Sequence, residues 1–260
     1  MTSATSTTGT LGWWRLTVLH TRYQFLETVR VPIAVIGNLL FPTLALFFFV
    51  VPQREVADDP LAATSAVAQL ATFAVASTCL FTFGAGVAED RQLPFDPYLR
   101  TLPAGAAPRT AGRVVNGILW CLLAIVPLVL VGALLTSASV SPGQLVGGLG
   151  MVPVIAVPFL LLGISVGYAL TAKAAIAVVQ ALLFPLAFAG GLFLPPSLFP
   201  GWLDAISQAL PTRAARDLVV RVTTGEHGSA VALPVLVGWT VLFAALAVSA
   251  YRRDEGRRFR

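Results

Sequence analysis

The chain has 260 residues, of which 57% are hydrophobic and only 11% are charged, and its formal net charge is +5. Soluble domains carry about 25% charged residues, so this composition excludes a water-solvated globular protein and makes lipid the main solvent. The positive charge does not indicate a nucleic-acid partner, because the arginines flank apolar runs as membrane topology requires.

The first 30 residues are predicted to form a cytoplasmic tail followed by an amphipathic helix that lies along the membrane interface. Helical spacing places one set of apolar side chains on a common face: Leu11, Trp14, Val18, Phe25 and Val29. The opposite face holds His20, Glu27, Gln24 and Thr17. Arg22 projects near the apolar face, where its long side chain can reach lipid headgroups. The alternative is a flank that serves only to orient the first span.

Six apolar runs are long enough to span a membrane, which needs about 20 residues. They cover residues 32–51, 61–87, 114–135, 144–170, 174–194 and 231–251. Residues 31–251 are therefore predicted to be one six-helix transmembrane domain, and residues 252–260 a basic cytoplasmic tail. With both termini in the cytoplasm, 13 of the 17 basic residues lie inside, which the positive-inside rule favours.

Residues 88–113 form the largest predicted cytoplasmic loop between spans. The loop joins a charged cluster to an apolar and aromatic set: Glu89, Asp90, Arg91, Phe95, Tyr98, Leu99 and Arg100. Such a set can pack against a partner while the charges fix the register, which a simple connection would not require. The alternative is a loop packed on its own protein.

Residues 195–230 are predicted to form an external helical cap. The first helix shows apolar residues at helical spacing before a closing proline: Trp202, Leu203, Ile206, Leu210 and Pro211. A second short helix opposes apolar to charged residues: Leu218, Val219 and Val222 against Arg213, Arg216, Asp217 and Arg221. Two short amphipathic helices between a membrane exit and a re-entry predict an interfacial or partly re-entrant cap.

The sequence offers no catalytic, cofactor-binding or metal-binding residues. It contains no GxxxxGK[ST] motif, so it lacks a P-loop for ATP. His20 and His227 are predicted on opposite membrane faces, and Cys79 and Cys121 are expected to be buried small hydrophobic residues. The spans hold essentially no ionisable residue, which argues against the alternative of an ion-coupled secondary transporter. A non-transport membrane protein is a further alternative.

The layout resembles the ABC-2 type permease family of bacterial exporters, and the resemblance covers essentially the whole chain. Two stretches carry it beyond topology: GAGVAEDRQLPFDPYLRTLPAGAAPRTAGRVVNG at 84–117 and FPLAFAGGLFLPPSLFPGWLDAISQALPTRAARDLV at 184–219. Where the family has a glutamate-rich cluster with a following Gly-Thr, this chain reads Glu89-Asp90-Arg91 and then Gln92-Leu93-Pro94.

The resemblance implies an all-α integral membrane protein of six spans, with an N-terminal interfacial helix, a cytoplasmic coupling helix and an external re-entrant helix pair before the last span. It also implies that two permease subunits, identical or paralogous, rest on two ABC ATPase subunits, which bind ATP and Mg²⁺. The chain itself would then be no enzyme. The expected coupling contacts are Glu89, Asp90, Arg91, Phe95, Tyr98, Leu99 and Arg100. The implied location is the bacterial cytoplasmic membrane, and the implied cargo is hydrophobic or amphipathic.

Overall fold

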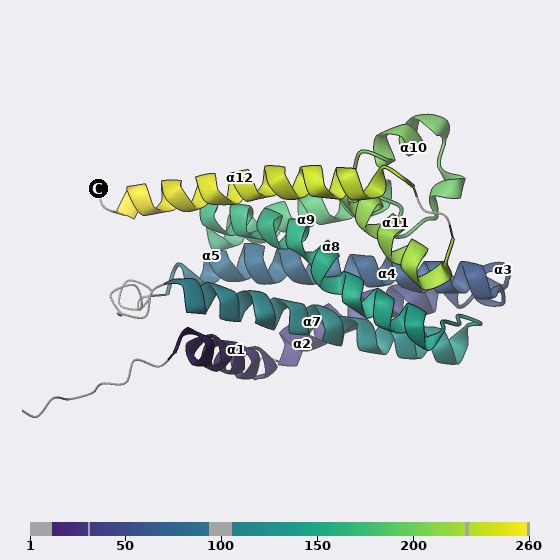
Figure 1. The fold of residues 1–260 in the computed structure, drawn as a ribbon, viewed down its shortest axis with the longest axis horizontal. Helices are drawn as coiled ribbons and strands as arrows, with labels where there is room; N and C mark the ends of the chain where they lie inside the picture. The colour runs from purple at the N-terminus through teal and green to yellow at the C-terminus, as the bar shows by residue number, and fades with distance from the viewer. Residues whose placement is uncertain (1–11, 31, 94–105, 227–228, 259–260) are drawn as a thin grey trace, which may run out of the picture.

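The computed structural model describes residues 12–30, 32–93, 106–226 and 229–258, and every secondary-structure element in these ranges is helical. Figure 1 shows long helices that run side by side along one axis. One end of the bundle, called the basic end below, holds α1 (Trp13–Val29), α5 (Gly86–Asp90) and the last turns of α12 (Ala232–Arg258). The opposite end, called the cap end, holds α3 (Arg54–Ala57) and α10 (Gly201–Ser207).

Five described helical segments are long and apolar enough to cross a membrane: Pro60–Asp90, Pro108–Leu135, Pro142–Ala169, Ala172–Ala189 and Ala232–Asp254. They match the last five predicted spans and confirm an all-helical, multi-span fold. The first combines α4 (Pro60–Leu80), the π-helical segment η2 (Phe81–Ala85) and α5. The others are α7 (Ala106–Leu135), α8 (Pro142–Ala169), α9 (Ala172–Ala189) and α12.

The first predicted span falls on α2 (Pro32–Ala45) and the π-helical segment η1 (Leu46–Val50). Within it, the described part Leu39–Val50 is an apolar helix shorter than the five spans. A crossing here stays a prediction. The α1 helix and the last turns of α12 lie at the same end of the bundle, as an even number of crossings requires.

Local sequence signals explain where the spans begin and end. The Asp59 side chain accepts a hydrogen bond of 2.7 Å from the Ala62 N–H and caps α4. Ser141 and Gln144 form a reciprocal capping box at the start of α8. The α9 helix ends at Ala189, before the predicted limit of residue 194, because Gly191 turns the chain with a φ of +75°.

The α4 helix is the centre of the bundle, and most of its residues are buried. The helices α2, α7, α8 and α9 pack around it, together with the shorter α11 (Pro211–Thr224). The outer helices α9 and α12 bury little of their surface and expose large apolar side chains such as Phe188 and Val241. Apolar residues on the outside and small residues in the middle are what a lipid-solvated bundle requires.

Glycines bring α8 into direct backbone contact with the η2 segment. A Cβ at Gly163 would lie 3.0 Å from the Cys79 carbonyl oxygen, and one at Gly167 would lie 2.6 Å from the Phe83 carbonyl oxygen. A side chain at either position would therefore push the two helices apart. The Gly163-x-x-x-Gly167 spacing of the sequence therefore marks close packing within the subunit.

The interfacial helix predicted over residues 11–30 corresponds to α1, which packs against the first turns of α7. Its protein-facing side is polar: Thr17 is buried, and the Thr21 hydroxyl donates a 3.2 Å hydrogen bond to the Gly112 carbonyl. The predicted apolar residues Trp14 and Val18 are exposed, as is Arg22. Phe25, by contrast, turns inward and stacks on Trp120.

Candidate functional site at the basic end

The first three predicted coupling residues end the α5 segment at the basic end of the bundle. Glu89 is exposed, Asp90 forms an ion pair with Arg113 at the start of α7, and Arg91 is largely buried. The structure thus separates one outward-facing residue from two that bind the chain's own helices. The other predicted coupling residues, Phe95, Tyr98, Leu99 and Arg100, lie outside the described residues.

Arg91 connects α5 to the ends of α8 and α12. Its Nη1 donates hydrogen bonds to the carbonyl oxygens of Gly167, at 2.6 Å, and Leu170, at 3.4 Å. The last carbonyls of a helix have no partner within the helix and carry its negative dipole end, so a guanidinium suits them well. We call this set of contacts the Arg91 node.

The rest of the Arg91 node links α12. The Arg91 guanidinium pairs with Asp254, whose side chain is only 6% exposed. The Arg91 Cζ lies 5.4 Å from the centre of the Tyr168 ring, which meets Tyr251 of α12 edge-on at 5.1 Å. Three helices therefore converge on one cation at the point where the predicted coupling loop begins.

The far end of that loop is held by α1 and α7. Gly112 lets α1 approach closely, since a Cβ there would lie 2.7 Å from the His20 Cβ. Burial of His20, and then the charge of Arg109, lower the pKa of its imidazole, which keeps the ring neutral at neutral pH. With the Asp90–Arg113 ion pair, both ends of the loop are fixed to the bundle.

At the cap end, the residues predicted for the external helix lie on α10 and on the chain leading to α11. Trp202 is 67% exposed and Ile206 is also exposed, whereas Leu203 is half-buried. The α10 helix ends at Ser207, and after Leu210 the buried Pro211 begins α11. Pro211 therefore serves as a helix start, where a missing N–H has no cost.

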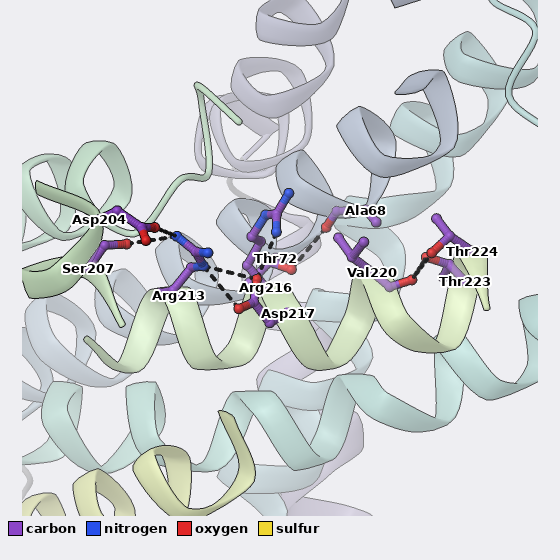
Figure 2. A network of polar contacts seen from close by, with 10 residues as sticks. All are labelled: Ala68, Thr72, Asp204, Ser207, Arg213, Arg216, Asp217, Val220, Thr223 and Thr224. Atoms are coloured by element: carbon purple, nitrogen blue, oxygen red, sulfur yellow. Dashed lines mark hydrogen bonds and ion pairs between the residues drawn. The ribbon is translucent and has the colours of Figure 1, made fainter. Parts of the chain in front are cut away.

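Arg213, Arg216 and Asp217 of α11 are largely buried rather than solvated (Figure 2), whereas Arg221 in its last turn is exposed. The Arg213 Nε donates to both carboxylate oxygens of Asp217, at 2.9 and 3.1 Å, and its Nη1 reaches Asp204 of α10 at 3.1 Å. Arg216 adds a 2.7 Å hydrogen bond to Asp217. Opposite charges in such contact compensate one another, which allows a polar helix inside an apolar bundle.

Other contacts hold α11 against the spans. The Thr212 hydroxyl donates to the Leu186 carbonyl of α9 at 2.6 Å, and the Trp239 Nε1 of α12 donates to the Ala209 carbonyl at 2.7 Å. The α11 helix also packs on α4, and its Val219 lines the same internal space as Thr72 of α4. Thr72 lies about 18 Å along α4 from Pro60, at 1.5 Å per residue. The α11 helix therefore reaches deep along the central helix.

Comparison with known proteins identifies the chain. The family model described as ABC-2 type transporter matches residues 15–223. The chain belongs to the ABC-2 type transporter family. Membership makes it a multi-pass membrane subunit of an ABC transporter, a class that lacks its own ATPase site and associates with an ABC ATPase partner.

Two relatives of this ABC-2 chain carry transport names. A protein of Bacillus subtilis (strain 168), named as transport permease YvfS, is 22% identical over 223 residues, which is 85% of this chain and 91% of the relative. The daunorubicin resistance ABC transporter permease protein DrrB1 of Streptomyces coeruleorubidus is 29% identical over 173 residues. That match covers 62% of this chain and 58% of DrrB1.

Sequence reasoning about this ABC-2 subunit missed the partners of Arg91. Asp254 stands beside Glu255 in the arginine-rich segment after the last predicted span, and this acidic pair was the signal that could have pointed to an ion pair. The two cysteines are buried free thiols, 3.7 Å apart, as predicted. Within the described ranges, no group of three or more potential metal ligands occurs.

Proposed function

We propose that this chain is the permease subunit of an ATP-driven exporter in the bacterial cytoplasmic membrane. Two such permeases, identical or paralogous, would work with two ATPase subunits that bind ATP and Mg²⁺. The cargo would be a hydrophobic or amphipathic molecule such as a drug, an antibiotic, a lipid or a glycolipid. The apolar interior of the bundle and the drug-resistance name of DrrB1 support this cargo class.

The observation that carries the proposal is the Arg91 node at the base of the 88–113 loop. A force applied to this loop by a partner would act on α5, and Arg91 would pass it to α8 through the Gly167 carbonyl and to α12 through Asp254. The close contacts at the glycines between α8 and η2 add a stiff connection next to the Arg91 node. Packed interiors transmit such strain because they are close to incompressible.

Within this scheme the coupling residues divide into two groups. Asp90 and Arg91 position the loop, since both are engaged with the chain's own helices. Glu89 is exposed at the basic end and would contact the ATPase, together with Phe95, Tyr98, Leu99 and Arg100. The basic end would face the cytoplasm, where the positive-inside rule places the arginines.

The helices at the two ends would have separate roles. The α10–α11 pair would form a partly re-entrant external cap, because α11 packs along α4 with its buried charges Arg213, Arg216 and Asp217 paired. The exposed Trp202 and Ile206 of α10 would lie in the outer headgroup region. At the basic end, Trp14 and Val18 of α1 would insert into lipid while Arg22 reaches the headgroups.

Site-specific photocrosslinking in native membranes tests the proposal. A benzophenone amino acid replaces Glu89 in one variant and Leu134, which is 78% exposed near the cap end, in the control. The Glu89 position is expected to capture a P-loop ATPase, with a yield that changes when ATP and vanadate are added. Equal capture at both positions, or capture of no ATPase at Glu89, would remove the assignment of this loop.

A further inference from the structure

An apolar pocket lies between α4, α7, α8 and α11, in the half of the bundle nearest the cap end, and it is partly open where the exposed Ser139, Val140 and Leu145 line it. Its volume is about 110 Å³. Its α4 wall runs from Thr64 to Val75, about 16 Å at 1.5 Å per residue. The cavity lies inside one subunit and is separate from the Arg91 node at the basic end.

The walls offer hydrocarbon and no free hydrogen-bond donor from the threonines that reach them. The Thr72 hydroxyl donates to the Ala68 carbonyl at 2.9 Å, and the Thr223 hydroxyl donates to the Val219 carbonyl at 2.9 Å. The Thr64 hydroxyl donates to the Pro60 carbonyl at 2.7 Å. No charged residue is among the described residues that line the space. The lining Ser139 stands at the exposed side, so a polar or ionic ligand would find little inside to replace its hydration.

The size of the cavity narrows the ligand further. An engineered apolar cavity of about 150 Å³ in another protein stays dry and binds benzene, whereas a buried water needs two to four polar partners. A space of about 110 Å³ with these walls fits one small ring or a short hydrocarbon segment. Filling it would restore van der Waals contacts that the lining atoms lack.

One wall of the cavity is a helix that does not span the bundle. Val219 and Thr223 of α11 line the space, and α11 is seated on Gly147 and Gly148 of α8, where a Cβ would lie 2.7 and 3.0 Å from α11 side chains. The helix ends at Gly225, whose φ of +78° breaks it sharply. A displacement of α11 would therefore change the width of the cavity.

We propose that this cavity binds an uncharged hydrocarbon group, with α11 as one of its walls. The group would be either an apolar part of the exported cargo or an acyl chain of a membrane lipid. The cargo source rests on the exporter function proposed above, whereas binding itself needs neither an ATPase nor transport.

Photolabelling of the protein in lipid nanodiscs tests the proposal. The probe is adamantyl diazirine, an uncharged hydrocarbon, and labelled peptides are identified by mass spectrometry. Saturable labelling is expected on α4 between Thr64 and Val75, with competition by excess adamantane. Ala71→Phe fills the space and should reduce this labelling at least tenfold, whereas the exposed Ala245→Phe on α12 should leave it unchanged.

Two further measurements keep the test decisive. Val152→Ala enlarges the cavity and should increase saturable labelling, which guards against a filling variant that fails to fold. Nanodiscs made with a phosphatidylcholine that carries a diazirine in its acyl chain distinguish the sources: labelling of α4 indicates a lipid tail, and labelling by adamantyl diazirine alone indicates cargo. Labelling that neither probe saturates, or that a folded Ala71→Phe variant retains, overturns the proposal. Such a failure would leave the capture of an ATPase at Glu89 untouched.

Discussion

Replacing Arg91 by methionine should separate ATP hydrolysis from transport. Methionine keeps much of the apolar stem of arginine but removes the guanidinium that joins α5 to the Gly167 carbonyl and to Asp254. The Asp254 carboxylate, 6% exposed, then loses its contact with the Arg91 guanidinium. Motion of the 88–113 loop would no longer be passed to α8 and α12 together.

The size of the effect follows from the burial of the pair. Breaking a buried ion pair costs about 3–5 kcal/mol, and a hydrogen bond to a charged group contributes about 1.5–3 kcal/mol. Because the Arg91 side chain is 17% exposed, we take the lower limit of the cost of breaking the pair, about 3 kcal/mol. At 1.36 kcal/mol per tenfold, this changes by roughly 150-fold the equilibrium constant between two states of the loop base, one attached to α8 and α12 and the other detached.

The assay pairs ATP hydrolysis with cargo uptake in inverted vesicles, alongside the Tm of the purified complex. Arg91→Met should retain hydrolysis, lose at least tenfold in cargo moved per ATP, and lower the Tm. The control is Arg54→Met, because the Arg54–Asp58 pair is 74% and 66% exposed and exposed pairs contribute little. If Arg91→Met matches Arg54→Met in both the coupling ratio and the Tm, the reasoning about the Arg91 node is refuted.

Three further predictions concern packing, pH and topology. Gly167→Leu should lower the Tm strongly, since a Cβ there would meet the Phe83 carbonyl oxygen at 2.6 Å. The control Gly150→Leu should leave the Tm unchanged, because a Cβ at Gly150 has nothing within 4 Å. Equal Tm values for the two variants would contradict the close contact. Because the pKa of His20 is lowered in the docked helix, α1 should become easier to proteolyse as pH falls below about 6.5, and His20→Gln should abolish that change. Cysteines that replace Thr5 and Arg258 should not be labelled by membrane-impermeant reagents in intact cells. Labelling of either cysteine from outside would contradict the cytoplasmic location of both termini.

The sequence predicted the spans well because length and apolarity decide them. Asp59 and Ser141 mark helix starts, and both spans begin directly after them. The end of the fifth span was placed too late, because an apolar run does not reveal that Gly191 turns the chain. The six-span total depends on residues 32–51, where the described apolar helix Leu39–Val50 is short.

The α1 helix shows why an amphipathic pattern is ambiguous in lipid. In water the apolar face of a helix packs on the protein, but a lipid-solvated helix can turn it outward. Here Thr17 and Thr21 pack near Gly112, while Trp14 and Val18 are exposed. Small and polar residues at the protein contact are typical of helices in membranes, where lipid takes the apolar side.

Long-range ion pairs could not be predicted from local pattern. Arg91 and Asp254 are 163 residues apart, and only the fold brings them together. The burial of Arg213 and Asp217 likewise depends on α10 and α4, which surround α11. Helical spacing placed Arg213, Arg216, Asp217 and Arg221 on one side of α11, but the first three are largely buried and Arg221 is exposed, because solvation depends on the neighbouring helices.

Transport by the purified complex tests the central claim most directly. The chain and its ATPase are reconstituted in liposomes, with daunorubicin as the first cargo to test because of the name of DrrB1. The account predicts cargo movement that requires ATP and disappears when the catalytic P-loop lysine of the ATPase is replaced. Movement driven by this chain alone under an ion gradient, with no ATPase present, would contradict it.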